Sequence, residues 1–166
     1  MAAVSLKEDL ASGTGLPVPT ALIGRSGKKV YIANRPAYQG SDGYDPHLQD
    51  MIAEAVPFAC HVMERQVPAS VEPLHLFYID PKESLDFNVT RLVGFLRSLC
   101  GTKRTWLPLS SSHTLMMHTL LLSLPQLVGL DLSSLTLMHI GDNGQHPGLE
   151  LLARNHGMGY CFHALY

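Results

Sequence analysis

Polar residues able to bind a ligand follow each of four apolar segments in this sequence. The stretch LMHIGDNGQHPG, residues 137–148, is an example: a run of apolar residues leads into aspartate, asparagine, glutamine and histidine. Collected along the chain, these residues form one candidate ligand-binding set: Asn34, Arg35, Asp80, Ser110, Ser111, Ser112, His113, Asp142, Asn143 and His146.

The residue types in this set indicate an anion site with a divalent cation. Asp80 and Asp142 supply carboxylate oxygens, which Mg²⁺ and Ca²⁺ prefer as ligands, and a neighbouring asparagine could complete the shell. Ser110–Ser112 at the start of a predicted helix offer hydroxyls and free backbone N–H groups to an anion. Arg35 has the fork geometry that matches a phosphate or a carboxylate. A divalent cation held by Asp80 and Asp142 is the one cofactor that these residues indicate.

The same residues also have ordinary structural interpretations, which stay open at this point. An aspartate before Pro81 ends a strand and turns the chain, and serines before a helix act as caps. The tetrapeptide GDNG is a common turn sequence. His139 and His163 lie inside apolar segments, and we expect both to be hydrogen-bonded core residues.

Five strand-like segments alternate with four helix-like segments along the chain. A run of β-branched and aromatic residues predicts a strand, and apolar residues three and four apart predict a helix. Pro57 falls inside the first helix and predicts a kink there or two helices. The predicted strands cover 30–33, 74–79, 104–109, 134–140 and 159–166, and the predicted helices cover 46–63, 83–101, 110–129 and 146–157.

This strict alternation predicts an α/β fold. Strands that alternate with helices are parallel and joined by right-handed crossovers, with helices on both faces of the sheet. We therefore expect a three-layer α-β-α sandwich with a mainly parallel five-stranded sheet, flavodoxin-like or Rossmann-like. Residues 1–19 are predicted to be a flexible leader and residues 20–166 a single domain. Since parallel strands end at one edge, the candidate set should gather there.

Composition narrows the class of protein. The 166 residues carry a formal charge of −2 and only 16% charged residues, so no basic field exists to hold a nucleic acid. Three cysteines without a C-x-x-C pair are typical of a reducing compartment, and we expect a cytoplasmic protein. The most apolar run, 115–130, is too short and too interrupted to span a bilayer.

Two functions from different classes are compatible with the sequence. Because G-x-G-x-x-G, G-x-x-x-x-G-K-[ST] and G-x-S-x-G are all missing, we expect a non-enzymatic interaction or assembly module. Its partner would be another protein or a second copy, contacted through Tyr38 and Tyr44 in the long loop before the first helix. The alternative is a small metal- or anion-dependent hydrolase or transferase. It would act on a phosphorylated or acidic small molecule at the strand edge.

Overall fold

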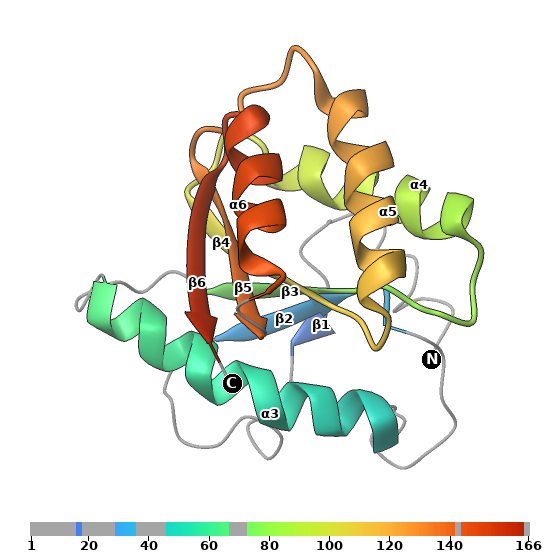
Figure 1. Ribbon diagram of the computed structural model, residues 1–166. Helices are drawn as coiled ribbons and strands as arrows, with labels where there is room; N and C mark the ends of the chain where they lie inside the picture. Colours follow the sequence, from blue (N-terminus) through green and yellow to red (C-terminus); the bar gives the residue numbers. More distant parts are fainter. Residues whose placement is uncertain (1–15, 18–28, 36–45, 67–72, 142–143, 165–166) are drawn as a thin grey trace.

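The structure, a computed structural model, describes residues 16–17, 29–35, 46–66, 73–141 and 144–164 (Figure 1). Among the described residues, no helix combines the length and the apolar character that a membrane span requires. The strands are β1 (Leu16–Pro17), β2 (Val30–Ala33), β3 (Leu74–Tyr78), β4 (Arg104–Leu109), β5 (Leu135–Gly141) and β6 (Gly159–Ala164). The helices are α3 (Pro46–Gln66), α4 (Leu85–Leu99), α5 (His113–Ser123), the 3₁₀ turn η1 (Leu124–Leu127) and α6 (His146–Asn155).

The six strands form one sheet in which they lie in the order of the chain, from β1 to β6. Strands β2 to β6 are all parallel, which confirms the predicted five-stranded sheet and the three-layer, Rossmann-like α/β fold. Leu16–Pro17, within the predicted leader, pairs antiparallel with β2 and adds an edge strand. Because the strand order never reverses among these strands, the sheet has no switch point of the kind that forms the ligand crevice in flavodoxin-type folds.

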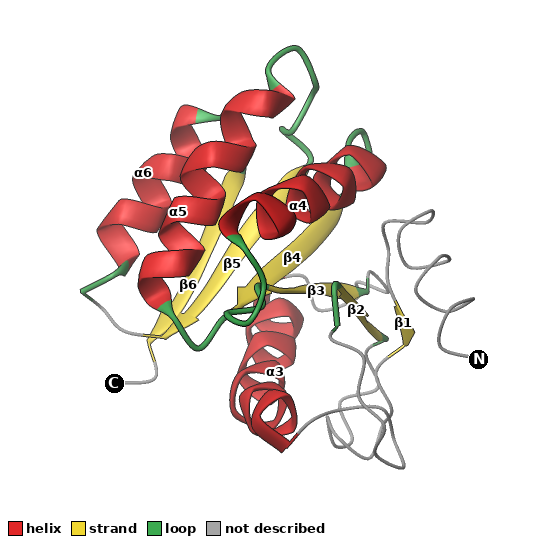
Figure 2. Ribbon diagram, turned by 90° about the vertical axis from the view of Figure 1, so that its right-hand side faces the viewer, coloured by secondary structure: helices red, strands yellow, loops and turns green. Residues whose placement is uncertain are grey.

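The helices cover the two faces of the sheet unequally (Figures 1 and 2). Helices α4, α5 and α6 pack on one face, around a core that includes Phe77, Trp106 and Leu137. Helix α3 packs alone among the described helices on the other face, against Leu76, Leu107 and other core residues.

The placement of α3 changes the hand of one connection. Each strand from β3 to β6 is added on the same side of the strand before it. Because α3 lies on the opposite face of the sheet from α4, α5 and α6, the connection through α3 has the opposite hand to the other three. The prediction that all crossovers are right-handed is therefore wrong for this one. Four crossovers of one hand would leave the second face of the sheet bare, and buried parallel sheets need both faces covered.

Helix α3 is a single helix of 21 residues that begins at Pro46, where proline suits the first helical position. Pro57 lies inside it on the exposed side. The helix continues through this proline and is not divided into the two helices that the sequence allowed. Water can hydrogen-bond the carbonyl that this proline leaves unpaired. The buried stripe faces the sheet, at positions three and four apart: Leu48, Ile52, Ala55, Val56, Ala59, Val62 and Met63.

Strands β4 and β5 part before they end, and this divides the carboxyl edge of the sheet. Their pairing covers only Arg104–Trp106 with Leu135–Leu137. Beyond it β4 stays with β3, where the Ile79 N–H donates to the Leu109 carbonyl at 2.8 Å, and β5 stays with β6. Peptide groups alternate sides along a strand, so Pro108 faces β5. Proline has no N–H to donate to a ladder, which accounts for the end of the pairing at this point.

Candidate functional site

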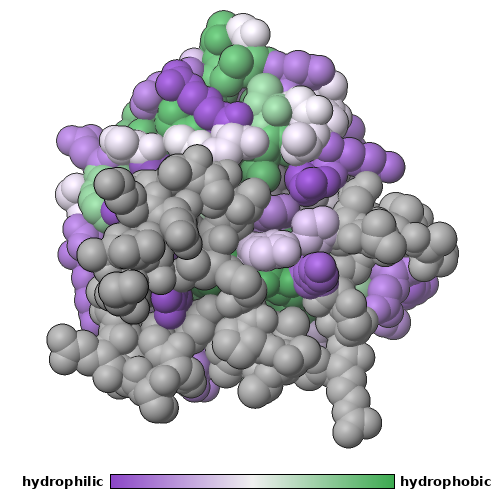
Figure 3. Space-filling model, turned by 180° about the vertical axis from the view of Figure 1, so that it is seen from behind, coloured by the Kyte–Doolittle hydropathy of each residue, from purple (hydrophilic) through white to green (hydrophobic). Residues whose placement is uncertain are grey.

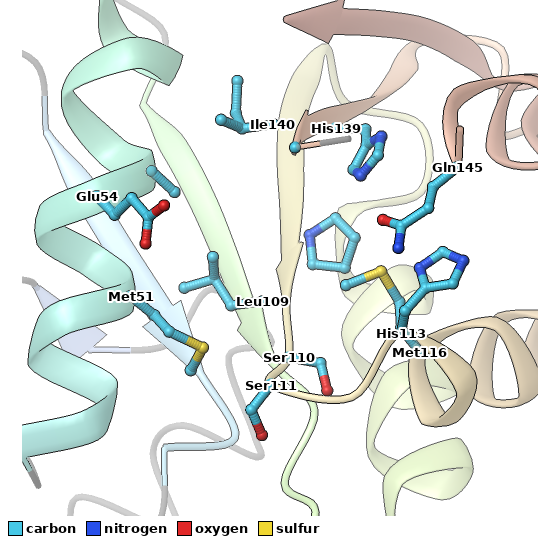
Figure 4. Close-up of a pocket in the computed structure, with 13 residues that line it drawn as sticks. Met51, Glu54, Leu109, Ser110, Ser111, His113, Met116, His139, Ile140 and Gln145 are labelled. Carbon is cyan, nitrogen blue, oxygen red and sulfur yellow. The ribbon is translucent and has the colours of Figure 1, made fainter. Parts of the chain in front are cut away.

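A pocket of about 460 Å³ lies where β4 and β5 separate, at the carboxyl edge of the sheet (Figure 4). This volume is within the range of about 300–1,000 Å³ typical of small-molecule sites. Helices α3 and α5 and the residue before α6 contribute to it, because α3 passes over one face of the gap while α5 and α6 start at the other. The lining residues are Met51, Glu54, Ala55, Pro108, Leu109, Ser110, Ser111, His113, Met116, His139, Ile140, Gly141 and Gln145.

One wall of the pocket is apolar except for a single carboxylate. Met51, Glu54 and Ala55 come from neighbouring turns of α3, and Leu109 and Ile140 from the ends of β4 and β5. Ala55 and Leu109 are buried, whereas Glu54 is exposed and lies on the same side of β4 as Met51 (Figure 4). This wall can cover an apolar body and offers a negative charge beside it.

The opposite wall carries hydroxyl, imidazole and amide groups. Ser110 and Ser111 follow β4, and His113 is the first residue of α5. His139 and Gln145 face them from β5 and from the residue before α6 (Figure 4). Two helices thus begin at this wall, and the first N–H groups of a helix favour a negatively charged ligand.

The serines of the predicted cluster have distinct local roles. The Ser112 hydroxyl caps α5 by accepting the Leu115 N–H at 3.2 Å, and it does not line the pocket. The Ser110 hydroxyl accepts the Ser112 N–H at 3.1 Å and keeps its own proton available to a ligand. Ser111 is exposed at the rim. The capping and the binding interpretations therefore apply to different members of the cluster.

His139 is a nearly buried imidazole, 5% exposed, in the pocket wall. A Cβ atom at Gly141 would approach its Nε2 to 3.0 Å, so the glycine leaves room for the ring. On its far side the ring lies against Phe162, with the ring centroids 5.4 Å apart. The prediction of a core position for His139 agrees with its burial, but it did not include a place beside a cavity.

His146 lies behind this wall rather than in the pocket. Its ring stacks on Phe162, with the centroids 4.3 Å apart, and on Tyr160, with the centroids 5.4 Å apart. Its Nδ1 is 3.1 Å from the Tyr160 hydroxyl. Burial, reinforced by the Glu150 carboxylate, raises the pKa of Tyr160 to about 12. His146 thus stacks on both Tyr160 and Phe162, and Phe162 in turn packs at a tilt against His139 in the pocket wall.

Asn34 and Asp80, two further candidates, belong to a hydrogen-bond network at the ends of β2 and β3. The Asn34 amide donates to the Tyr78 carbonyl at 2.8 Å and to the Asn88 Oδ1 at 3.3 Å. Asn88, fully buried in α4, accepts the Asp80 N–H and donates to the Asp80 carbonyl, both at 2.9 Å. The Asp80 carboxylate accepts the Lys82 N–H at 2.9 Å, as in a turn. These contacts connect two strands and a helix.

The structure thus divides the predicted candidate set. Ser110, Ser111 and His113 line the pocket; Asn34, Arg35, Asp80, Ser112 and His146 do not. Four candidates lie outside the described residues: Tyr38, Tyr44, Asp142 and Asn143. Of the predicted Asp80–Asp142 metal pair, the structure therefore describes Asp80 alone. Within the described ranges, no three His, Cys, Asp or Glu side chains are grouped so as to hold a metal ion.

Three polar lining residues, Glu54, His139 and Gln145, were missing from the predicted set. Gln145 had a signal in the sequence, since it stands between two candidates in the loop after a strand. Glu54 had none, because it belongs to the polar face of an amphipathic helix.

Comparison with known proteins adds no relative: no family model, no curated protein and no solved structure matches the chain.

Proposed function

We propose that this protein binds a small acidic molecule, a carboxylate or a phosphate ester, in the pocket between β4 and β5. The observation that carries the proposal is the convergence of Ser110, His113 and Gln145 from separate elements on one wall of a cavity of about 460 Å³. Neutral donors of this kind, with imidazoles that can take up a proton, recognise an anion without a fixed positive charge.

The surroundings of this wall support the same conclusion. It includes the first residue of α5 and the residue before α6, so the positive ends of two helix dipoles lie at this wall. Phe162 packs between His139 and His146 in the ring contacts of this wall, which places one imidazole beside the cavity. A site of this type is rigid on the side where the charged end of the ligand would bind, which lowers the entropic cost of binding.

The test is a thermal-shift titration of the intact chain with hexanoate, succinate and inorganic phosphate. A ligand that binds only the folded state at a hundred times its Kd stabilises it by about 2.7 kcal/mol. For a chain of this size, that corresponds to a rise in Tm of about 5–10 °C. We expect at least one of these acids to raise the Tm to this extent.

The variant His113→Ala should weaken that binding about tenfold, since it removes one donor from the wall. His118→Ala is the matched control, because His118 is exposed on the same helix and does not line the pocket. The proposal fails if none of the acids changes the Tm, or if His113→Ala binds the acid as tightly as the unmodified chain.

A second candidate function, an assembly or interaction module, has its own observation. Leu121 and Leu122 on α5 are each 49% exposed, and Val128 and Leu130 after η1 are 83% and 42% exposed. Hydrophobic residues also gather at the upper end of the molecule in Figure 3. A helix that is apolar on all sides is normally buried or covered, and α5 is buried on one side only.

Light scattering after size exclusion tests this second function. If a second copy covers α5, the chain runs as a dimer, and Leu121→Ser with Leu122→Ser converts it to a monomer. Phe58→Ser is the control, because Phe58 is similarly exposed, at 43%, on α3 at the opposite face of the sheet. A chain that is monomeric at every concentration contradicts self-association through this surface.

A further inference from the structure

Aliphatic side chains line the pocket on the side opposite its amide and imidazole groups. Figure 4 shows Met51, Leu109 and Ile140 on one side of the end of β4, and Gln145 on the other. Apart from the exposed Glu54, the side chains that the figure labels on the first side are apolar down to the serines after β4. A ligand that fills the cavity therefore meets hydrogen-bond donors at one end and aliphatic groups along the rest of its length.

Two of these aliphatic side chains have apolar surface left to bury. Met51 and Ile140 pack against the core between α3 and the sheet, yet both are only half-buried and both line the pocket. A hydrocarbon chain that lies along them removes apolar surface of the ligand and of the protein from water, which stabilises the complex. A second acidic group in the same place would instead lose its water to aliphatic neighbours, at a high cost in free energy.

We propose that the ligand is a monoacid whose remaining part is an unbranched aliphatic chain. This inference rests on the proposed function and narrows it to one ligand class. The acidic group lies at the wall of Ser110 and Gln145, where the serine hydroxyl and the amide can both donate hydrogen bonds. The chain lies along Met51, Leu109 and Ile140.

The two methionines of the pocket suit a flexible chain. Met51 approaches from α3, and Met116, which is buried, from α5 on the other side of the end of β4 (Figure 4). Thioether side chains have three rotatable bonds and adapt to chains of slightly different length. We therefore expect the affinity to rise with each methylene group added, until the chain fills the cavity.

Isothermal titration calorimetry of the intact chain with butyrate, hexanoate and succinate tests this inference. Butyrate and succinate have four carbons each and differ in one end group, whereas hexanoate adds two methylene groups to butyrate. Each buried methylene group strengthens binding about three- to fourfold, so hexanoate should bind about tenfold more tightly than butyrate. Succinate should bind at least about tenfold more weakly than butyrate, because its second carboxylate lies against the aliphatic wall.

The variant Met51→Gln places an amide on the aliphatic wall. Glutamine has nearly the length and the helix propensity of methionine, so the fold should persist. The preference for hexanoate over butyrate should fall from about tenfold to about threefold or less, while butyrate binds nearly as before. Met117→Gln is the matched control, because Met117 is also a half-buried helical methionine and does not line the pocket. It should leave the preference unchanged.

The inference about the chain and the proposed function fail in different ways. If hexanoate binds no more tightly than butyrate, if succinate matches butyrate, or if Met51→Gln keeps the full preference, the aliphatic-chain inference is overturned. The acid-binding function still stands as long as one of the acids binds. If neither these three acids nor inorganic phosphate binds, the proposed function fails as well.

Discussion

Replacing Trp106 with alanine should destabilise the folded protein by about 4 kcal/mol, the largest loss expected from a single substitution here. Trp106 lies in the core under α4–α6, is fully buried and packs edge to face with Phe95 at a centroid distance of 6.0 Å. Truncation removes its apolar surface and leaves a cavity that rigid neighbours cannot fill. The loss is a large share of the 5–15 kcal/mol typical of a folded domain.

Urea denaturation followed by far-UV circular dichroism measures this loss. Fluorescence is unsuitable, because the chain has one tryptophan and the variant removes it. The conservative variant Trp106→Phe keeps most of the volume but loses the hydrogen bond from Nε1 to the Met158 Sδ, 3.2 Å long, so it should cost about 1–2 kcal/mol. A loss below about 1 kcal/mol for Trp106→Ala would contradict the placement of this residue in the core.

The variant Asn88→Leu should cost about 3 kcal/mol of stability. Leucine has a similar volume but breaks every bond that the amide makes: the buried Asp80 N–H loses the Asn88 acceptor, and the Asp80 carbonyl keeps the Glu83 N–H at 3.2 Å but loses the amide donor. Each unsatisfied buried group costs about 1–3 kcal/mol. Asn34, which has a positive φ of 64° at the end of β2, loses one of its contacts at the same time.

Equilibrium unfolding of Asn88→Leu beside Thr90→Ala separates this network from a general effect on α4. Thr90 is exposed two residues further along the same helix, and its substitution should change stability by no more than about 0.5 kcal/mol. Equal stabilities of the two variants would show that the hydrogen bonds of Asn88 contribute little. Asn88→Asp should also destabilise, because it loses both donors and buries a charge.

The fold class could be predicted because it depends on patterns within single segments. The continuous apolar run of β3 and the helical spacing of α4 each indicate their own structure, and their alternation indicates parallel strands. The boundaries agree closely for β2 and β4, which are bounded by turn-forming or polar residues. In α4 the capping residue Ser84, whose hydroxyl accepts the Phe87 N–H at 3.1 Å, lies within the predicted helix.

The pocket could not be predicted, because it depends on relations between segments. Pro108 ends the β4–β5 pairing only because its backbone nitrogen faces β5 rather than β3. The sequence of β4 alone does not reveal which neighbouring strand this nitrogen faces. Glu54 reaches the pocket only because α3 packs on the opposite face from the other helices and contacts β5. The role of Asn88 is hidden for the same reason, since its partners come from β2 and β3.

The sequential order of the strands has a consequence for how the protein forms during synthesis. Each parallel strand lies beside the strand that precedes it in the chain, so its neighbour has already left the ribosome when it emerges. Pairing each strand with the one before it keeps the closed segments shorter than a reordered sheet would need, and folds with pairings closer in sequence form faster. The sheet can therefore grow one β-α unit at a time from its amino-terminal side. The pocket is completed late, when β5 and the start of α6 arrive beside a wall that α3 and β4 have already built.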